Sequence, residues 1–221
     1  MSIQGLYTAL ITPFSHGAVD YGKLKEVVEA QIQGGVDGIL PTGTTGESPT
    51  LSVDEHLEVI EKVIEYANGR CKIMAGTGAN CTEEAIRLTK KAKAMGADSC
   101  LQVTPYYNKT SQAGLVAHFT AMAEAGGIPV ILYNVPSRTG LNIAPETALE
   151  LSKHPLINGL KEASGNISQV AKIAQLCGDD LNLYSGNDDQ VVPLLSLGGK
   201  GVISVVSNVK PELVHNCCKA W

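Results

Sequence analysis

A lysine within an apolar segment is the residue of this sequence with the clearest capacity for chemistry. Lys161 lies in residues 157–164 (INGLKEAS), after a run of apolar and small residues. Burial disfavours an ammonium ion and lowers its pKa, and a neutral lysine amine can attack a carbonyl carbon to form a Schiff base. A second interpretation stays open, in which Lys161 reaches solvent at a strand end or pairs with Glu162.

Two residues near the preceding apolar segment favour the Schiff-base interpretation. Tyr133 lies near the end of residues 129–136 (PVILYNVP), where a phenol can transfer protons. Arg138 follows shortly after, and a guanidinium can hold a substrate carboxylate through a bidentate pair. The alternatives are a core or rim aromatic residue for Tyr133 and a solvated loop charge for Arg138.

Residues 43–47 (GTTGE) form a short loop segment with an anion-binding character. Backbone N–H groups and hydroxyls in such a segment can surround a phosphate or a carboxylate, and the residues do not match the GxxxxGK[ST] phosphate loop. Other polar or small residues also follow apolar segments, namely Thr12, Thr77, Tyr106, Tyr107, Ser185, Gly186, Asn187 and Ser204.

The composition narrows the class of protein. The 221 residues include 17 Lys and Arg and 22 Asp and Glu, which gives a net charge of −5 without long runs of one sign. This excludes a nucleic-acid binder that uses a basic surface and a polybasic membrane patch. The residues are 44% hydrophobic, but no apolar stretch approaches the ~20 residues of a membrane span.

Cysteines and histidines indicate neither a disulfide framework nor a metal site. The six cysteines contain no CxxC pair and the five histidines stand apart from them, so we expect no metal and a reducing cytoplasmic location. Cys217 and Cys218 fall in a predicted helix, Cys217 facing the core and Cys218 the surface. Val214, Cys217 and Trp221 are expected to form one apolar stripe of that helix.

Eight apolar segments alternate with amphipathic ones along the chain. Helices are indicated by apolar spacing in residues 24–32, 57–64, 85–95, 115–122 and 170–177, by a capping box at Ser52 and Glu55, and by Pro145 and Pro211 at predicted first turns. The eight predicted strands are residues 7–14, 36–43, 71–78, 98–105, 129–136, 157–164, 181–188 and 201–208.

This alternation predicts a single-domain (β/α)8 TIM barrel over residues 1–221. Continuous apolar strands favour a parallel sheet covered by helices, and eight units favour a closed barrel. The alternative is an open dinucleotide-binding sheet, but the first turn lacks a GxGxxG motif and residues 76–81 (GTGANC) supply only its first two glycines. Barrel active sites form at the C-terminal ends of the strands, where the residues named above fall.

Three motifs together resemble the dihydrodipicolinate synthase family of pyruvate-dependent class I aldolases. They are GTTGE at residues 43–47, YNVPSRTG at residues 133–140 and GLKEASG at residues 159–165. The resemblance covers essentially the whole sequence, and Arg138 within the second motif favours the synthases over their relatives. The family also has a helical segment after the barrel, whereas this sequence stops within the predicted eighth helix.

The resemblance assigns roles to individual residues. Lys161 would form the Schiff base with pyruvate, and Tyr133, Thr44 and Tyr107 would form a proton relay. Tyr107 would enter a neighbouring subunit's site across a dimer interface, in a homodimer or homotetramer. Thr45 would bind the carboxylate of pyruvate, Arg138 that of aspartate semialdehyde, and Gly186 and Ile203 would line the pocket.

The activity implied is 4-hydroxy-tetrahydrodipicolinate synthesis, in lysine and diaminopimelate biosynthesis, without a cofactor. Alternatives are N-acetylneuraminate lyase, a 2-keto-3-deoxy sugar acid aldolase, or a catalytically inactive barrel. By the same resemblance, L-lysine would act as a feedback inhibitor at the dimer interface. Its matching positions are Ser48, His56, Asn80, Glu84 and Tyr106, although His56 and Glu84 also fit ordinary solvated helix positions.

Overall fold

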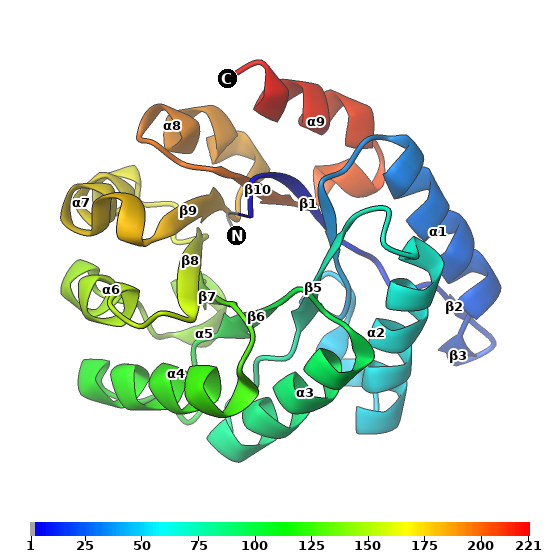
Figure 1. Cartoon of the computed structure of the whole chain (residues 1–221), viewed down its shortest axis with the longest axis horizontal. Coiled ribbons are helices and arrows are strands. Elements are labelled where there is room, and N and C mark those ends of the chain that lie inside the picture. The colour runs from blue at the N-terminus through cyan, green and yellow to red at the C-terminus, as the bar shows by residue number, and fades with distance from the viewer. Residues whose placement is uncertain (1–2) are drawn as a thin grey trace.

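The computed structural model describes residues 3–221 and contains a closed barrel of parallel strands with helices around it (Figure 1). The order around the barrel is β1-β10-β9-β8-β7-β6-β5-β4, and β1 pairs with both β4 and β10. The barrel strands are β1 (Gly5–Ala9), β4 (Gly38–Leu40), β5 (Lys72–Gly76), β6 (Ser99–Val103), β7 (Val130–Asn134), β8 (Ile157–Glu162), β9 (Asn182–Ser185) and β10 (Gly201–Ser204).

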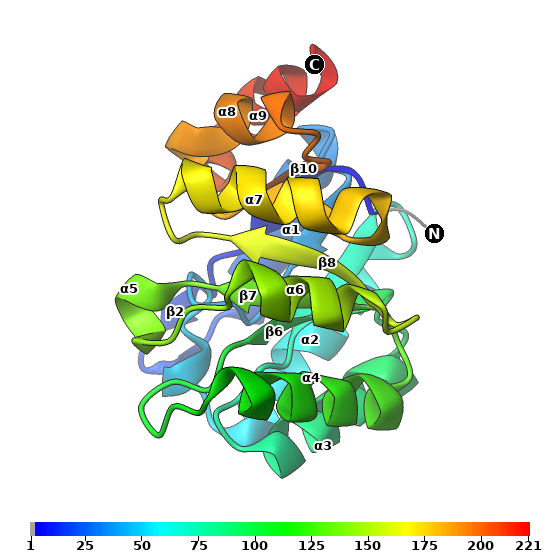
Figure 2. The same cartoon turned by 90° about the vertical axis from the view of Figure 1, so that its left-hand side faces the viewer.

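The helices lie outside the barrel, as Figure 1 and the turned view in Figure 2 show. They are α1 (Tyr21–Gln33), α2 (Val53–Ala67), α3 (Thr82–Met95), α4 (Gln112–Gly126), α5 (Pro136–Thr139), α6 (Pro145–Ser152), α7 (Ile167–Cys177), α8 (Val191–Ser196) and α9 (Pro211–Lys219). Short 3-10 helices include η1 (Ser48–Thr50), η2 (Gly178–Asp180), η3 (Asp188–Gln190) and η4 (Val206–Asn208). The predicted (β/α)8 fold is confirmed.

Helix starts follow the chemistry expected from the sequence. The backbone N–H of Glu55 donates to Ser52 Oγ over 3.3 Å, and the Ser52 N–H donates to Glu55 Oε2 over 2.9 Å. This capping box satisfies two backbone donors that helix geometry leaves without a partner. Pro145 and Pro211 occupy the first positions of α6 and α9.

The strand predicted over residues 201–208 ends at Ser204, and η4 occupies Val206–Asn208. Two other small elements also depart from the sequence prediction. Residues 7–14 were expected to form one strand, but β1 ends at Ala9 and a hairpin of β2 (Phe14–Ser15) and β3 (Ala18–Val19) follows. His16 and Gly17 both have positive φ in the connecting turn, which suits a tight hairpin. The second element is α5, which begins at Pro136 and ends before Gly140 in the left-handed region.

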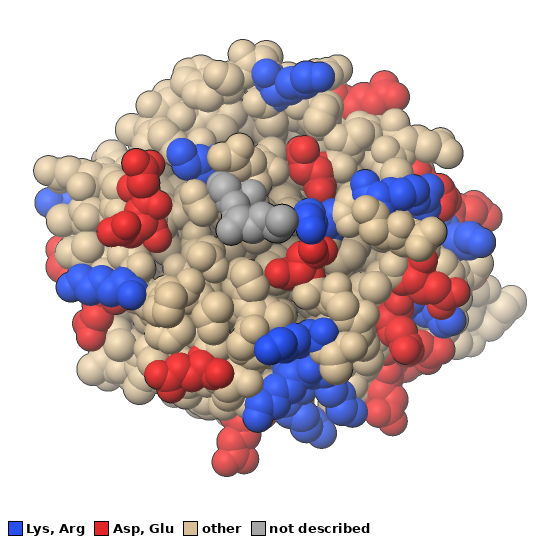
Figure 3. Space-filling model, in the orientation of Figure 1, with Lys and Arg blue, Asp and Glu red and all other residues tan. Residues whose placement is uncertain are grey.

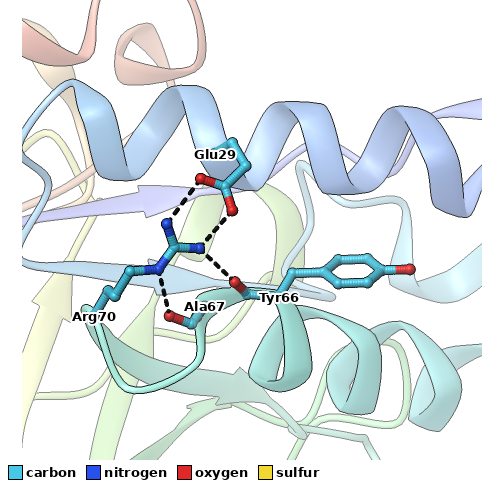
Figure 4. A network of polar contacts seen from close by, with 4 residues as sticks. All are labelled: Glu29, Tyr66, Ala67 and Arg70. Carbon is cyan, nitrogen blue, oxygen red and sulfur yellow. Dashed lines mark hydrogen bonds and ion pairs between the residues drawn. The ribbon is translucent and has the colours of Figure 1, made fainter.

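Two aspartates repeat one arrangement where barrel strands begin. The Asp37 carboxylate accepts the Leu6 N–H over 2.8 Å, and the Asp98 carboxylate accepts the Ile73 N–H over 2.9 Å. Each aspartate precedes one strand and binds the start of its neighbour, so it fixes the register of the pair. Arg70 has a comparable role outside the barrel, where its guanidinium joins Glu29 of α1 to the carbonyls that end α2 (Figure 4).

The last helix corrects the prediction for its apolar face. Val214 is buried and Cys218 packs against the same core, whereas Cys217 and Trp221 are exposed. The predicted roles of the two cysteines are therefore reversed, and the predicted stripe is wrong. At about 100° per residue, the fourth residue after Val214 lies closer to its direction than the third. Helix α9 ends at Lys219, before Trp221.

The surface shows charges of both signs. Figure 3 shows basic and acidic side chains interspersed over one face, among uncharged residues. Within residues 3–221, no helix combines the length and the hydropathy needed to cross a membrane.

Candidate active site

A cavity of about 490 Å³ opens at the C-terminal ends of the barrel strands. Its lining comes from the last residues of β7 and β8 and from the segments that follow β4, β7, β8, β9 and β10, which is where barrel enzymes place their catalytic groups. The lining residues are Thr44, Tyr133, Val135, Ser137, Arg138, Lys161, Ala163, Gly186, Asn187, Asp188, Asp189 and Val205.

Lys161 is buried in this cavity and is a strong nucleophile candidate. Its side chain comes from β8 and is only 5% exposed. Burial lowers the pKa of its amine to about 8, with the Asp188 carboxylate acting against this change and Arg138 adding to it. At pH 7 about a tenth of such an amine is neutral, far more than for an exposed lysine.

Strand register places Tyr133 beside Lys161. The two residues are partners in the β7–β8 pair, and Lys161 Nζ lies 4.3 Å from the centre of the Tyr133 ring. Burial raises the pKa of the Tyr133 phenol, while Arg138 and a hydrogen bond with Thr44 oppose that rise. The phenol and the amine therefore meet in one buried layer, with Thr44 in contact with the phenol.

Glu162 points to the opposite side of β8 and does not pair with Lys161. Its carboxylate accepts hydrogen bonds from Asn134 Nδ2 at 3.0 and 3.2 Å, from Gln169 Nε2 at 3.0 Å and from the Ser164 N–H at 2.7 Å. Alternation along the strand sends neighbouring residues to opposite faces. The interpretation of Lys161 as a partner of Glu162, or as a lysine that reaches solvent, is wrong.

Gly186 and Ile203 support the cavity in different ways. A Cβ atom at Gly186 would lie 2.7 Å from Ala163 Cβ and 3.0 Å from Lys161 Cε, so the glycine leaves room for the lysine. Ile203 is fully buried in the barrel interior, in the same apolar cluster as Tyr133 and Ala163. It packs with the cavity wall instead of lining the open space.

Arg138 reaches the cavity from α5. Within the described chain its guanidinium has no ion pair, so it is free to bind an anionic group. Asp188 and Asp189 line the cavity as well. Sequence reasoning missed both acids, although Asp188 is the last residue of the strand predicted over residues 181–188 and Asp189 follows it, so both could have been examined with the other residues at strand ends.

Besides Ile203, two further predicted site residues, Tyr107 and Thr45, lie apart from the cavity lining. Tyr107 is 92% exposed, in the segment after β6, and its φ of +67° is rare for a residue with a side chain. Thr45 is half-buried in the turn beside Thr44. The structure thus brings together Lys161, Tyr133 and Thr44, but leaves Tyr107 pointing into solvent.

A second cavity, of about 210 Å³, contains most of the predicted effector residues. Ser48, His56, Glu84 and Tyr106 line it together with apolar residues of α2 and α3. Asn80 lies beside it, and its amide Nδ2 donates to the Tyr106 carbonyl over 3.3 Å. Four of the five predicted residues therefore share one pocket.

His56 in this second cavity is not a solvated helix residue. Its side chain is 7% exposed and its Nε2 lies 2.7 Å from the Gly76 carbonyl. Since a carbonyl accepts, Nε2 carries the proton and Nδ1 is left as an acceptor. Burial lowers the pKa of the imidazole, although the Gly76 contact and Glu84 act against it. A neutral acceptor thus lies near the Glu84 carboxylate.

Within residues 3–221, no three His, Cys, Asp or Glu side chains are placed to hold a metal ion. The groups that line the first cavity offer the chemistry of an amine (Lys161), a phenol (Tyr133) and a guanidinium (Arg138).

The sequence matches one protein family over almost its whole length. Residues 2–221 match the dihydrodipicolinate synthetase family. The 4-hydroxy-tetrahydrodipicolinate synthase of Geobacter sulfurreducens is 52% identical over 218 residues, which are 99% of this chain and 75% of that protein.

Solved structures agree with this match. A chloride-inhibited dihydrodipicolinate synthase from Acinetobacter baumannii, complexed with pyruvate, has a TM-score of 0.97 and 45% identity, covering 99% of this chain and 76% of that one. The Cyanidioschyzon merolae enzyme with lysine bound has a TM-score of 0.94 and 44% identity, covering 98% of this chain and 74% of that one.

Proposed function

The chain belongs to the dihydrodipicolinate synthetase family and has the function of a 4-hydroxy-tetrahydrodipicolinate synthase in lysine biosynthesis, and we propose that Lys161 forms its Schiff base. The single observation that supports this role best is a buried amine with a lowered pKa, in register with Tyr133. The relatives' shared function also decides against the lyase, sugar acid aldolase and inactive-barrel alternatives.

The reaction begins at the neutral amine of Lys161. Its lone pair attacks the keto carbon of pyruvate, and loss of water gives an iminium ion. The cationic nitrogen withdraws electrons, so the neighbouring methyl group loses a proton and an enamine forms. Tyr133 takes that proton while passing its own to Thr44, with which it is hydrogen bonded, and Thr44 releases its hydroxyl proton to Tyr107 of a second copy of the chain and so to solvent.

The enamine carbon then attacks the aldehyde carbon of aspartate semialdehyde. The new carbon–carbon bond regenerates the iminium, and the aldehyde oxygen takes a proton. The substrate's own amine next attacks the iminium carbon and displaces Lys161, which closes the ring and frees the lysine. Arg138 binds the carboxylate of the second substrate, and the turn that contains Thr45 binds that of pyruvate.

Tyr107 acts in a second copy of the chain. Its side chain is almost fully exposed and lies outside its own cavity lining, and its backbone holds an unusual positive φ. These features support a dimer in which each subunit's Tyr107 completes the proton relay of the other.

Borohydride trapping tests the assignment of Lys161. Reduction in the presence of pyruvate should fix one pyruvate-derived adduct, which peptide mass spectrometry should locate at Lys161. Lys153 and Lys172 are exposed lysines in neighbouring elements and serve as internal controls. An adduct on either control, or no adduct, contradicts the assignment.

Replacing Arg138 with alanine should weaken use of the second substrate. Loss of a charge-assisted bidentate pair costs on the order of 1.5–3 kcal/mol, so KM for aspartate semialdehyde should rise by about one to two decades. Pyruvate trapping at Lys161 should remain close to that of the parent. Steady-state kinetics and trapping, measured side by side, separate the two effects, and equal damage to both would assign Arg138 a structural role.

We also infer that the second cavity binds L-lysine as an inhibitor. The Glu84 carboxylate can pair with an ammonium group, His56 Nδ1 can accept from another, and Ser48 and Tyr106 supply hydroxyls. The structure of the Cyanidioschyzon merolae relative, which has lysine bound, supports a lysine ligand for this family member. The coupling free energy between an effector site and an active site is typically about 1–3 kcal/mol.

Activity measured against lysine concentration should show partial or full inhibition of the parent. Glu84→Thr should lose that inhibition, because it removes the carboxylate that faces the cavity. Glu83→Thr is the matched control, since Glu83 is exposed in the same helical turn. A parent that is dimeric, active and indifferent to lysine contradicts the site.

A further inference from the structure

Asp188 is the lining residue of the catalytic cavity with the most extensive hydrogen bonding to another loop. Its Oδ1 accepts from Ser204 Oγ over 2.5 Å, and its Oδ2 accepts the backbone N–H groups of Val205 and Val206 over 3.0 and 3.1 Å. Ser204 is the last residue of β10, and Val205 and Val206 belong to the turn that follows it. One carboxylate from η3 therefore holds the turn that contributes Val205 to the cavity wall.

The same turn is joined to the far side of the barrel mouth. Ser204 Oγ also accepts the Ser207 N–H over 3.0 Å. Asn208 Nδ2 donates to the Ala9 carbonyl over 2.8 Å, and Asn208 Oδ1 accepts the Ile11 N–H over 3.1 Å. Asp188 is thus one end of a hydrogen-bond chain that connects the segments after β9, β10 and β1.

This carboxylate also lines the cavity that contains the reacting amine. The charged and titratable groups around Lys161 are Tyr133 from β7, Arg138 from α5, Tyr184 from β9, and Asp188 and Asp189 from η3. Arg138 destabilises a positive charge on Lys161, and Asp188 stabilises one. Both groups act in a cavity that is largely closed to water at Lys161, where charges interact more strongly than in bulk solvent.

The Schiff-base chemistry places two opposing electrostatic requirements on the surroundings of the Lys161 nitrogen. The amine must lose its proton before it can attack, which burial promotes. The iminium that follows is a cation in the same buried cavity. If its nitrogen released the N–H proton to solvent, the neutral imine that results would no longer activate the neighbouring methyl group. A fixed negative charge, held by three donors before the reaction starts, stabilises that cation without reorganisation.

We propose that Asp188 is a positioning residue for the Schiff-base step, which fixes the wall formed by the turn after β10 and keeps a negative charge beside the Lys161 iminium. This rests on the proposed role of Lys161. Asp188 itself makes no bond to substrate in this scheme, and acts through Lys161, through the Ser204 hydroxyl and through the backbone N–H groups of Val205 and Val206.

Asp188→Asn isolates the charge from the contacts. The amide oxygen can still accept from Val205 and Val206, and its NH2 group can donate to Ser204 Oγ once that hydroxyl rotates. The rate of pyruvate trapping should rise with pH in the parent and level off near the pKa of Lys161. In the variant this rise should move to lower pH by roughly half a unit to one unit, and the apparent Kd for pyruvate should increase several-fold.

Three further variants make the result specific. Ser204→Ala keeps the charge but removes one contact, so the pH midpoint should stay at the parent value. Asp179→Asn removes a charge from η2, outside the cavity lining, and should also leave the midpoint unchanged. Asn187→Asp adds a carboxylate to the cavity wall and should raise the midpoint, which keeps the proposal testable if Asp188→Asn fails to fold.

The outcomes separate this proposal from the assignment of Lys161. A parent that traps pyruvate on Lys161, with unchanged midpoints in both Asp188→Asn and Asn187→Asp, overturns the role of Asp188 and leaves the proposed function intact. A parent that traps nothing on Lys161 overturns both. Shifts in opposite directions for the two variants, with none in the controls, support the proposal.

Discussion

Replacing Lys161 with methionine is expected to abolish turnover and to make the barrel more stable. The amine is the nucleophile of the proposed mechanism, and a thioether cannot replace it. Turnover should therefore fall to background, a loss of roughly four decades or more. Methionine has a similar length and is apolar, so it can occupy the same buried space in β8 without requiring a partner for a charge.

The gain in stability follows from the lowered pKa of Lys161. Its folded pKa of about 8 lies below the ordinary value near 10.4, so at neutral pH folding places an ammonium ion where it is disfavoured. The difference corresponds to a penalty of about 3 kcal/mol as an order of magnitude. Removing it should raise Tm by several degrees.

The sign of the pH dependence makes this prediction specific. Between about pH 8 and pH 10 the unfolded lysine keeps a proton that the folded one has lost, so the parent gains stability as pH rises through this window. The advantage of Lys161→Met should be full below pH 8 and should shrink toward pH 10. Thermal unfolding at pH 7 and pH 10 measures it, with Lys153→Met as an exposed control. A variant less stable than the parent at pH 7 contradicts the expected penalty.

Burial and chemistry together made the centre of the site predictable. An apolar strand that contains one lysine restricts the environment of Lys161, and β7 precedes β8 both along the chain and around the barrel. The contact between Lys161 and Tyr133 follows from that neighbourhood and from the register. The sequence alone could not decide between Glu162 and the cavity as the environment of Lys161, because that depends on which face of the strand each residue occupies.

Residues whose role depends on contacts with loops far away in the sequence were harder to predict. Asp188 and Asp189 look like solvated acids after a strand, and only the folded chain brings residues 204–206 to the Asp188 carboxylate. Helix α5 escaped prediction because four residues are too few for a helical periodicity. His56 also gave no sign of burial in the sequence, because only the folded chain places its ring against the Gly76 carbonyl of β5.

Helix α9 shows how a small difference in direction around the helix axis reverses a prediction of which residue is buried. Cys217 and Cys218 are equally apolar and adjacent, so composition cannot choose between them. The choice depends on the direction in which Val214 packs against the barrel, which selects Cys218. The sequence therefore predicted which helices and strands form, and their order, more accurately than it predicted which face of a helix or strand a residue occupies.

Tyr133→Phe should separate formation of the Schiff base from the carbon–carbon bond formation that follows. The phenylalanine ring can keep its place beside Lys161 Nζ, so the surroundings of the amine should change little and pyruvate trapping should persist. The hydroxyl that moves the methyl proton is lost, and general acid–base catalysis contributes about two to four decades. We therefore expect turnover to fall by that factor while the adduct still forms.

Exchange of the pyruvate methyl protons in deuterated water measures the affected step directly by NMR. The parent should exchange them at a rate compatible with turnover, and Tyr133→Phe should slow this exchange about as much as turnover. Thr44→Val is the companion variant, because it removes the hydrogen bond to the phenol and leaves Tyr133 in place. Its exchange should be slowed less. If exchange in Tyr133→Phe matched the parent while turnover fell, the hydroxyl would act after enamine formation, and the relay would have to be assigned to a later proton transfer.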